Sequence, residues 1–147
     1  MIVHRLAKAA FTALDGEGAR LFGGRWNSPG RPMIYAAASP SLAVLEVLVH
    51  LDLPPELMPD DYRLLSLELP DPGPIEHIEQ TPEDDGARLA IGDRFLTDMA
   101  SLALTVPSVV VPQERNTLIN PRHPAAVGLR LVSNEPFSLD ARLLGRN

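Results

Sequence analysis

The stretch LFGGRWNSPGRPMIYAAASP, residues 21–40, passes from a glycine-rich loop into an apolar strand and ends at the cap of a helix. The glycines before Arg25 and Trp26 let the backbone approach another group closely and adopt a positive φ. Arg25 in such a loop could reach a phosphate of a ligand, and the indole of Trp26 could support the loop or stack on a base. The competing interpretation is a surface turn with Trp26 folded onto the core.

Outward from this stretch, the apolar pattern predicts the other elements of the fold. Residues 1–7 alternate as an opening strand, and residues 33–38 form a second strand. Ser39 is a favourable N-cap and Pro40 suits the first helical turn, so a helix is expected from there to about Leu51. Further strands are predicted at 62–70 and 103–112, and 127–139 is predicted as a late strand followed by a loop. A second helix is predicted at 91–102, and loops at 11–32, 52–61 and 71–86.

These elements indicate an α+β fold with a mixed or antiparallel sheet and a few helices, because they show no regular βαβ alternation. The length of 147 residues suits one domain with its own core, so residues 1–147 are expected to form a single domain. The chain has no cysteine, which excludes disulfides and thiolate catalysis and fits a cytoplasmic protein. No signal peptide or membrane span is recognised, so no membrane association is expected.

The net charge of −6 argues against non-specific binding of nucleic acid, which needs a basic face. The basic residues are twelve arginines and the single Lys8. This imbalance either reflects the composition of the genome or marks arginines that serve as planar forks for phosphate or carboxylate. The four histidines lack metal-ligand spacing, and GEGARLFGG lacks the lysine and hydroxyl residue of a phosphate loop. Metal hydrolysis and P-loop chemistry are therefore not expected.

Glu46 is the first candidate for chemistry, because the helix that carries it is apolar on nearly every side. A carboxylate in such a helix must be paired, protonated or facing a cleft. The alternative is a pair with His50, one helical turn later, on a narrow exposed stripe. The sequence favours neither interpretation.

The remaining candidates are weak when each is taken alone. Arg5 lies on the opening strand and would be solvated if that strand were an edge. Tyr35 fits a core tyrosine as well as a ligand contact. Ser108 begins a buried run, where its hydroxyl could simply satisfy the local backbone. Asn116 and Asn120 bracket three residues in an arrangement that is common in turns.

Taken in order along the chain, these residues resemble the RES-domain family, named for an arginine, a glutamate and a serine. The resemblance rests on GGRWNSPGRPMIY with Arg25 and Tyr35, SLAVLEVLVH with Glu46, and VPSVVVPQERNTLINPRHP with Ser108, Asn116 and Asn120. The opening HRL with Arg5 and the closing FSLDARLL also fit, so the match covers nearly the whole chain. Thr117 departs from the family pattern, in which an aromatic residue often follows the first asparagine.

The resemblance implies a toxin of a two-gene toxin–antitoxin system, paired with an Xre-like helix-turn-helix antitoxin, and a fold like that of ADP-ribosyltransferases. It implies destruction of NAD⁺ at the nicotinamide–ribose bond by hydrolysis or by phosphorolysis. NAD⁺ is then a substrate, inorganic phosphate is the co-substrate in the second case, and no cofactor or metal is expected. We expect a homo-oligomer or a hetero-oligomer with the antitoxin. The alternatives are a mono-ADP-ribosyltransferase that modifies a cellular protein and a non-catalytic binding module of the same fold.

The resemblance also implies roles for single residues. Glu46 would stabilise an oxocarbenium-like ribose or grip its hydroxyls. Arg5 and Arg25 would hold the pyrophosphate, and Tyr35 would face the nicotinamide or the ribose. Ser108 would bond the carboxamide or orient Glu46. The expected catalytic residues are Glu46, Arg25 and Ser108, and the expected NAD⁺-binding residues are Arg5, Arg25, Tyr35, Glu46, Ser108 and Asn116.

Overall fold

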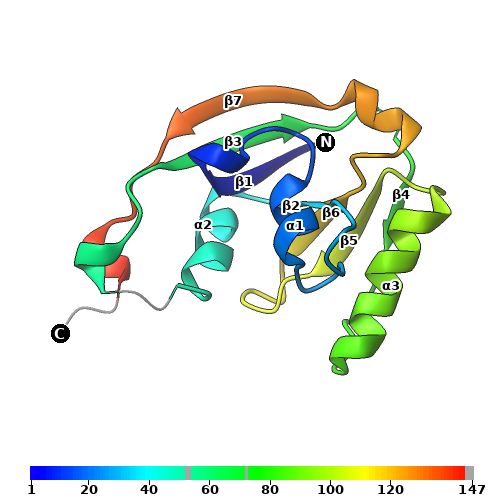
Figure 1. The fold of residues 1–147 in the computed structure, drawn as a ribbon, viewed down its shortest axis with the longest axis horizontal. Coiled ribbons are helices and arrows are strands. Elements are labelled where there is room, and N and C mark those ends of the chain that lie inside the picture. The colour runs from blue at the N-terminus through cyan, green and yellow to red at the C-terminus, as the bar shows by residue number, and fades with distance from the viewer. Residues whose placement is uncertain (52–53, 72, 145–147) are drawn as a thin grey trace.

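The computed structural model describes residues 1–51, 54–71 and 73–144, and a seven-stranded sheet forms its centre (Figure 1). The strands are β1 (Ile2–Lys8), β2 (Ile34–Ala37), β3 (Tyr62–Glu68), β4 (Ile75–His77), β5 (Ala103–Pro107), β6 (Arg115–Ile119) and β7 (Arg130–Pro136). They lie in the order β4-β5-β6-β2-β1-β3-β7. Neighbouring strands are antiparallel except β4 and β5, which are parallel, so the sheet is mixed.

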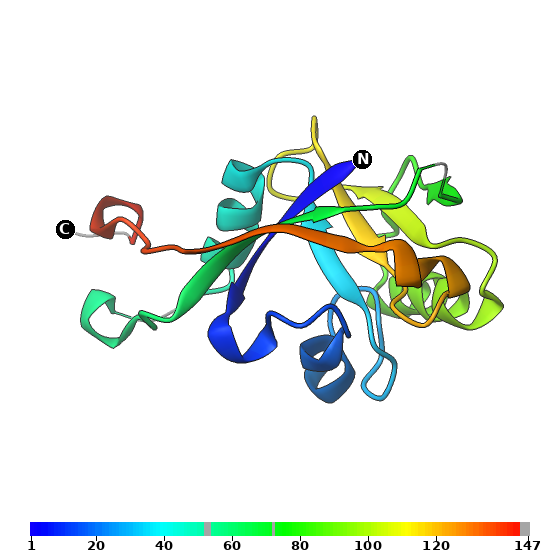
Figure 2. The same ribbon diagram turned by 90° about the horizontal axis from the view of Figure 1, so that it is seen from above.

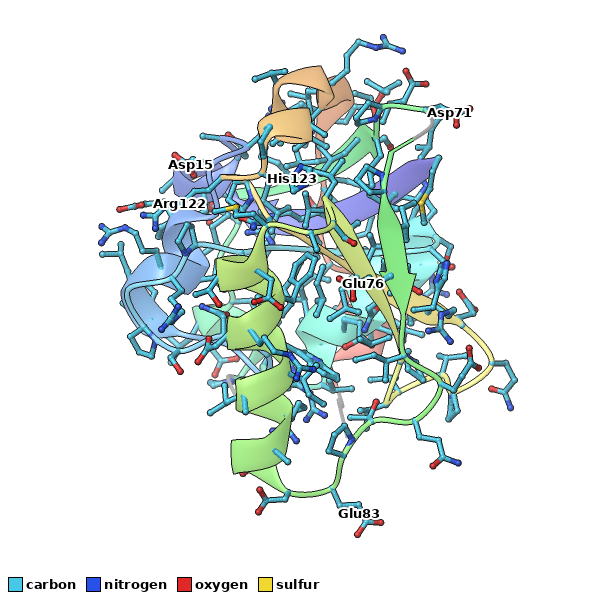
Figure 3. The ribbon with its side chains drawn as sticks, turned by 90° about the vertical axis from the view of Figure 1, so that its right-hand side faces the viewer. Asp15, Asp71, Glu76, Glu83, Arg122 and His123 are labelled. Carbon is cyan, nitrogen blue, oxygen red and sulfur yellow. The ribbon has the colours of Figure 1, made fainter. Side chains whose placement is uncertain are left out.

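The described residues also form three α-helices and four short 3-10 helices. The α-helices are α1 (Glu17–Phe22), α2 (Pro40–Leu48) and α3 (Asp85–Asp98), and the 3-10 helices are η1 (Ala9–Phe11), η2 (Pro55–Leu57), η3 (Pro124–Gly128) and η4 (Ala141–Leu143). Helix α2 packs on β1 and β2, whereas α3 lies beside β4 and β5, with Glu83 in the turn that leads into it (Figure 3). The predicted α+β class is confirmed. No helix in this part of the chain is long and apolar enough to cross a membrane.

The central strands bury both of their faces, and this explains why they read as nearly continuous apolar runs. Along β2, Ile34 joins one cluster of buried side chains and Tyr35 packs against another on the opposite face. The first cluster is Val3, Ala7, Ile34, Ala36, Leu65, Leu67, Leu69, Leu102, Ala103 and Ile119. The second is Trp26, Met33, Phe95, Leu96, Leu104, Val106 and Leu118, and it joins α3 to β5, β6 and the loop before β2.

The sheet opens between β1 and β2. These two strands pair only at His4 and Ala37, whereas β1 pairs with β3 along its whole length. Seen from above, β1 and β2 diverge from this point (Figure 2). Nη1 of Arg5 donates a hydrogen bond to the carbonyl oxygen of Tyr35 at 3.1 Å. A side chain therefore takes the place of a strand–strand hydrogen bond, and the space between the strands becomes available for a cleft.

The two edges of the sheet are short or irregular. At one edge, β4 has only three residues, and at the opposite edge β7 is exposed along most of its length. Ser133 lies opposite Ser66 and Leu131 opposite Leu67, so the register skips Val132 on β7. An extra residue of this kind is a β-bulge, which increases the local twist of the strand.

One α-helix and two strands were not expected from the sequence, and neither were the four 3-10 helices. Helix α1 lies in the segment 11–32 and β4 in the segment 71–86, both predicted as loops, and β6 contains Asn116, where a turn was expected. Each lacks a long apolar pattern, because α1 is short and contains Gly18, β4 is mostly exposed, and β6 begins with two polar residues. Part of the predicted loop 52–61 lies outside the described residues.

The other predicted elements are confirmed with shifted ends. The strands overlap β1, β2, β3, β5 and β7, and Ser39 caps α2 by accepting a hydrogen bond from the Leu42 amide. The second helix begins at Asp85 rather than at residue 91, because Asp84 Oδ2 caps it through the Ala87 amide at 2.8 Å. β1 is a central strand and not an edge, so Arg5 is half-buried rather than solvated.

We expect Gly92→Ala to destabilise the protein, although alanine favours an isolated helix by about 1 kcal/mol over glycine. A Cβ at position 92 would overlap the carbonyl oxygen of Trp26, which packs directly on α3. Overpacking of this kind costs about 1–3 kcal/mol. Urea unfolding measures the effect. Gly86→Ala is the control in the same helix, because its Cβ would meet only the end of the Asp84 side chain at 3.2 Å; equal stability of both variants would contradict the expectation.

Candidate active site

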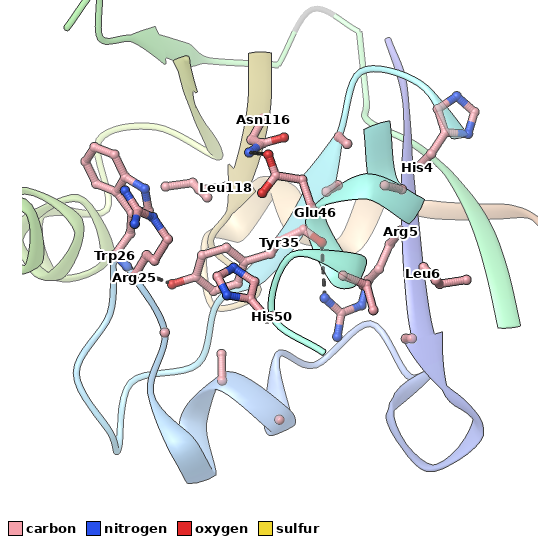
Figure 4. A pocket seen from close by; sticks show the side chains of 18 of the residues that line it. His4, Arg5, Leu6, Arg25, Trp26, Tyr35, Glu46, His50, Asn116 and Leu118 are labelled. Atoms are coloured by element: carbon pink, nitrogen blue, oxygen red, sulfur yellow. Dashed lines mark hydrogen bonds between the residues drawn. The ribbon is translucent and has the colours of Figure 1, made fainter. Parts of the chain in front are cut away.

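A cleft of about 480 Å³ opens where β1 and β2 diverge (Figure 4). This volume is typical of pockets that hold small-molecule ligands. Its walls come from segments far apart in the sequence, which include β1, η1, α1, the loop before β2, β2 itself, α2, β3, β5 and β6. Five of the six predicted site residues line it: Arg5, Arg25, Tyr35, Glu46 and Asn116. The sixth, Ser108, is buried behind Glu46.

Glu46 projects from α2 toward β6 and is held at one of its two oxygens (Figure 4). Oε1 accepts hydrogen bonds from Ser108 Oγ at 2.6 Å and from Asn116 Nδ2 at 3.0 Å. Among the residues that the structure describes, none donates a hydrogen bond to Oε2, and His50 lines the cleft without bonding Glu46. The carboxylate is therefore fixed in direction, with one oxygen still able to interact with a ligand.

Ser108 orients Glu46, and it satisfies the local backbone at the same time. Its hydroxyl oxygen accepts hydrogen bonds from the amides of Val110 at 3.1 Å and Val111 at 3.0 Å. A hydroxyl has two acceptor positions and one proton. Because the two amides occupy the acceptor positions, the proton is directed at Glu46. Of the two roles implied for Ser108, contact with Glu46 is the one that this geometry contains.

Asn116 is held in one amide orientation by the same carboxylate. Its Oδ1 is buried and has no hydrogen-bond partner among the described residues. Turning the amide over would bring Oδ1 against Glu46 Oε1 and leave two acceptors facing each other. An unsatisfied buried acceptor costs about 1–3 kcal/mol. The Asn116 side chain therefore orients the Glu46 carboxylate at the cost of leaving its own Oδ1 without a hydrogen bond.

Tyr35 anchors the glycine-rich loop that carries Arg25. Its hydroxyl donates to Asn27 Oδ1 at 2.5 Å and accepts from the Trp26 amide at 3.0 Å. Burial raises the pKa of Tyr35 to about 12, so the hydroxyl keeps its proton and remains a donor near neutral pH. The indole of Trp26 is buried against the core and also contributes to the cleft wall. Of the two interpretations of this loop, the packed one applies to Trp26.

Asn27 is an organising residue that the sequence patterns did not single out. Its Nδ2 donates to the carbonyl oxygens of Ala19 and Arg31, each at 2.9 Å, and it is fully buried. An asparagine three residues after a glycine pair is a signal for such a turn. Asn120, by contrast, bonds the Leu96 carbonyl and lies outside the cleft lining.

The two arginines of the cleft differ in environment. Burial lowers the pKa of Arg5, while the charge of Asp15 raises it. Nη1 of Arg5 donates a hydrogen bond to the Tyr35 carbonyl, so the position of the Arg5 guanidinium is fixed. Arg25 is exposed at the cleft wall. The cleft thus contains one fixed and one accessible guanidinium opposite a carboxylate, and the described residues include no group of three side chains suited to a metal ion.

The chain was also compared with known proteins. The family model described as "RES domain" matches residues 2–140. The chain belongs to the RES-domain family. The resemblance seen in the sequence is therefore confirmed, and the residues Arg25, Glu46 and Ser108 that carried it fall within the matched range.

This RES-domain chain is similar to several named proteins. It is 42% identical to "Toxin Res" of Pseudomonas putida, covering 97% of this chain and 99% of that protein. It is 36% identical to "Prs ADP-ribosylating toxin" of a Sphingobium species, covering 89% of this chain and 86% of that protein. Its fold matches a chain in the crystal structure of the M. tuberculosis MbcT–MbcA toxin–antitoxin complex, with a TM-score of 0.75 and 21% identity over 93% of this chain and 84% of that chain.

We expect Tyr35→Phe to lower the free energy of unfolding of this RES-domain protein by about 1–3 kcal/mol, because Asn27 Oδ1 and the Trp26 amide each lose a partner. Tyr35 ionises near pH 10 when unfolded and near pH 12 when folded, so its neutral hydroxyl contributes stability below pH 10 that is lost between pH 10 and 12. Urea unfolding at pH 8 and pH 11 should show a smaller alkaline loss in Tyr35→Phe than in the parent.

Tyr62→Phe is the matched control for this experiment. Tyr62 is buried too, and its hydroxyl makes no hydrogen bond with the described residues. Its substitution should therefore cost less stability at pH 8. Equal losses for the two variants would show that the hydrogen bonds of the Tyr35 hydroxyl add nothing to stability.

Proposed function

We propose that this RES-domain protein is the toxin of a toxin–antitoxin system and that it cleaves NAD⁺ at the bond between nicotinamide and ribose. The observation that carries the proposal is the carboxylate of Glu46, held by Ser108 and Asn116 in a cleft that also contains Arg5 and Arg25. The names of its relatives, "Toxin Res" and "Prs ADP-ribosylating toxin", support the class of activity.

The proposed chemistry uses Glu46 to stabilise positive charge. Nicotinamide leaves with both electrons of the glycosidic bond and becomes neutral, and the ribose becomes an oxocarbenium-like cation. A carboxylate beside that cation is worth more in a cleft that excludes water than it is in solution. Water or phosphate then attacks the ribose carbon, gives up a proton when it is water, and forms ADP-ribose or its 1″-phosphate. Ser108 and Asn116 hold Glu46 for this step, and neither needs to move.

The proposed role of the arginines is to hold the pyrophosphate, which carries the negative charge of the substrate. A guanidinium can donate two parallel hydrogen bonds to phosphate oxygens. Arg25, exposed at the wall, provides such a fork, and the fixed charge of Arg5 lies in the same cleft. Tyr35 presents its ring between these arginines and Glu46 (Figure 4).

Glu46→Gln should lower kcat for NAD⁺ consumption by about 10²–10³-fold, because the amide keeps the shape but removes the charge. The glutamine oxygen can still accept the hydrogen bonds of Ser108 and Asn116, so the fold should persist. Loss of NAD⁺ with purified protein is the measurement. Glu114→Gln is the matched control, since Glu114 also accepts a serine hydroxyl, that of Ser39 at 3.2 Å, but does not line the cleft.

Unchanged turnover in Glu46→Gln would contradict the role of this carboxylate. Failure of the parent protein to consume NAD⁺ at all would instead favour a non-catalytic binding module of the same fold.

Arg25→Ala should mainly weaken the binding of NAD⁺ and also lower the rate, because the contact with the phosphates positions the ribose.

A second candidate function is the transfer of ADP-ribose to a cellular protein. The similarity to "Prs ADP-ribosylating toxin" favours it, and the same cleft and carboxylate would serve. The two functions differ only in the group that attacks the ribose. Incubation of labelled NAD⁺ with and without phosphate, and with cell lysate, distinguishes them: the label appears in free ADP-ribose, in its 1″-phosphate, or on a protein band.

An antitoxin partner is part of the proposal. The fold match lies within a structure described as a toxin–antitoxin complex. We propose an Xre-like helix-turn-helix protein as the partner, in a hetero-oligomer, with the toxin acting in the cytoplasm and binding neither nucleic acid nor membrane itself. Co-purification with the product of a neighbouring small gene would test this.

A pair of aromatic side chains suits the base at the other end of the substrate. Phe22 of α1 is 74% exposed, and its ring packs edge-on against Phe11 with centroids 6.4 Å apart. Both residues line the same cleft, and α1 lies across it from Asn116 (Figure 4). An exposed aromatic face can stack on a nucleobase with a gain of about 1–3 kcal/mol. We propose that Phe22 contacts the adenine.

Phe22→Ala should therefore raise KM for NAD⁺ by about tenfold or more, which corresponds to the lost stacking. Nicotinamide mononucleotide has the scissile bond but no adenine, so its turnover by Phe22→Ala should equal that of the parent. Phe22→Trp should retain the low KM. An equal loss for both substrates would show that Phe22 shapes the cleft rather than binding the base.

A further inference from the structure

Helix α3 grips the backbone of the loop that carries Arg25. Arg88 on α3 is a buried arginine, 7% exposed. Its Nε donates to the carbonyl oxygen of Arg25 at 2.9 Å, and its Nη2 donates to Asp85 at 2.6 Å. Arg88 does not line the cleft. A charged side chain is thus buried in order to hold one peptide group of the loop.

Two further contacts on the same helix hold the next residues of the loop. The carboxylate of Asp93 accepts from the Ser28 amide at 2.9 Å and from its hydroxyl at 2.6 Å. Gly92 lets the carbonyl of Trp26 lie directly on the helix, where any side chain would overlap it. Residues 25, 26 and 28 are therefore each fixed to α3, while Tyr35 holds the amide of Trp26 from the other side.

The hydrogen bond from Arg88 holds the backbone of Arg25 and leaves the Arg25 side chain at the cleft wall. Burial of a guanidinium is costly, and an apolar residue would often fill the same volume with equal or better stability. The ion pair with Asp85 is largely solvated, since the Asp85 side chain is 84% exposed. Stability alone therefore explains an arginine at position 88 poorly. The hydrogen bond that fixes the Arg25 carbonyl explains it directly.

We propose that Arg88 is a positioning residue, which sets the place of the Arg25 guanidinium relative to Glu46 by holding the Arg25 carbonyl. The inference rests on the proposed function, because it assumes that Arg25 binds the phosphates of the substrate. It adds that this binding depends on α3, an element outside the cleft.

The test is a double-mutant cycle on kcat/KM for NAD⁺ with Arg88→Ala, Arg25→Ala and the double variant. Arg88→Ala should lower kcat/KM by about 10- to 100-fold, chiefly through KM, as expected for a displaced binding group. In the Arg25→Ala background the same change should have little further effect, because Arg88 acts through Arg25. Multiplying effects would overturn the proposal, since a purely structural role would lower activity in either background.

Two variants separate positioning from folding. Arg88→Lys retains a charged donor able to reach a single acceptor, and it should recover part of kcat/KM. Asp85→Ala removes the exposed partner of Arg88 but leaves its bond to Arg25, so its kcat/KM should stay within about twofold of the parent. A loss in Asp85→Ala equal to that of Arg88→Ala would assign the effect to the ion pair and contradict the proposal.

A fluorescence measurement remains informative even if the protein does not consume NAD⁺. Trp26 is the only tryptophan of the chain, and it lies in the loop that Arg88 holds, 3% exposed. Arg88→Ala should shift its emission to longer wavelength and increase quenching by acrylamide under native conditions, with Asp85→Ala unchanged. An unaltered Trp26 signal in Arg88→Ala would overturn the positioning role. A shifted signal, together with no loss of NAD⁺ in the parent protein, would contradict the proposed function and leave the positioning of the loop intact.

Discussion

The hydrogen bonds that Ser108 and Asn116 donate to a single oxygen of Glu46 connect the two sides of an opened sheet. Helix α2, which carries Glu46, packs on β1 and β2, where strand pairing is reduced to one position. Ser108 follows β5 and Asn116 belongs to β6, on the far side of that opening. The carboxylate and the Arg5–Tyr35 bond therefore hold a geometry that a continuous strand ladder would otherwise supply. The cleft exists because these side chains replace backbone pairing.

The opposite wall of the cleft is built on another principle. The loop before β2 has no regular structure, yet it is anchored through backbone groups by Arg88, Asp93 and Tyr35. The exposed side chain of Arg25 thus extends from a fixed main chain. Anchoring the main chain in this way limits the entropy that a bound ligand must remove. An anchored loop that carries Arg25 on one wall and the oriented Glu46 carboxylate on the other suit a ligand that is charged in its middle.

The sequence predicted the class of the fold and the cleft residues better than it predicted the elements that join them. Apolar runs and the Ser39 cap located β1, β2, β5 and α2, because burial on both faces leaves a strong pattern. β6 was missed because its first two residues are polar: Arg115 bonds Thr105 and the Ile78 carbonyl, and Asn116 bonds Glu46. The grip of Arg88 and Asp93 on residues 25–28 joins segments more than 60 positions apart, and no local pattern encodes such a contact. The role of Ser108 as a donor to Glu46 was one of two interpretations, and only its bonds with Val110 and Val111 decide the direction of its proton.

The edges of the sheet have a consequence for the behaviour of the chain at high concentration. An open edge strand offers unpaired amides and carbonyls to another molecule, which is a common route to aggregation. Here one border is a strand of three residues, and the other is bent by the extra Val132 and ends at Pro136, which has no amide to donate. Neither border presents a long flat ladder that a second chain could extend. The chain is in this way protected against polymerising through its own sheet.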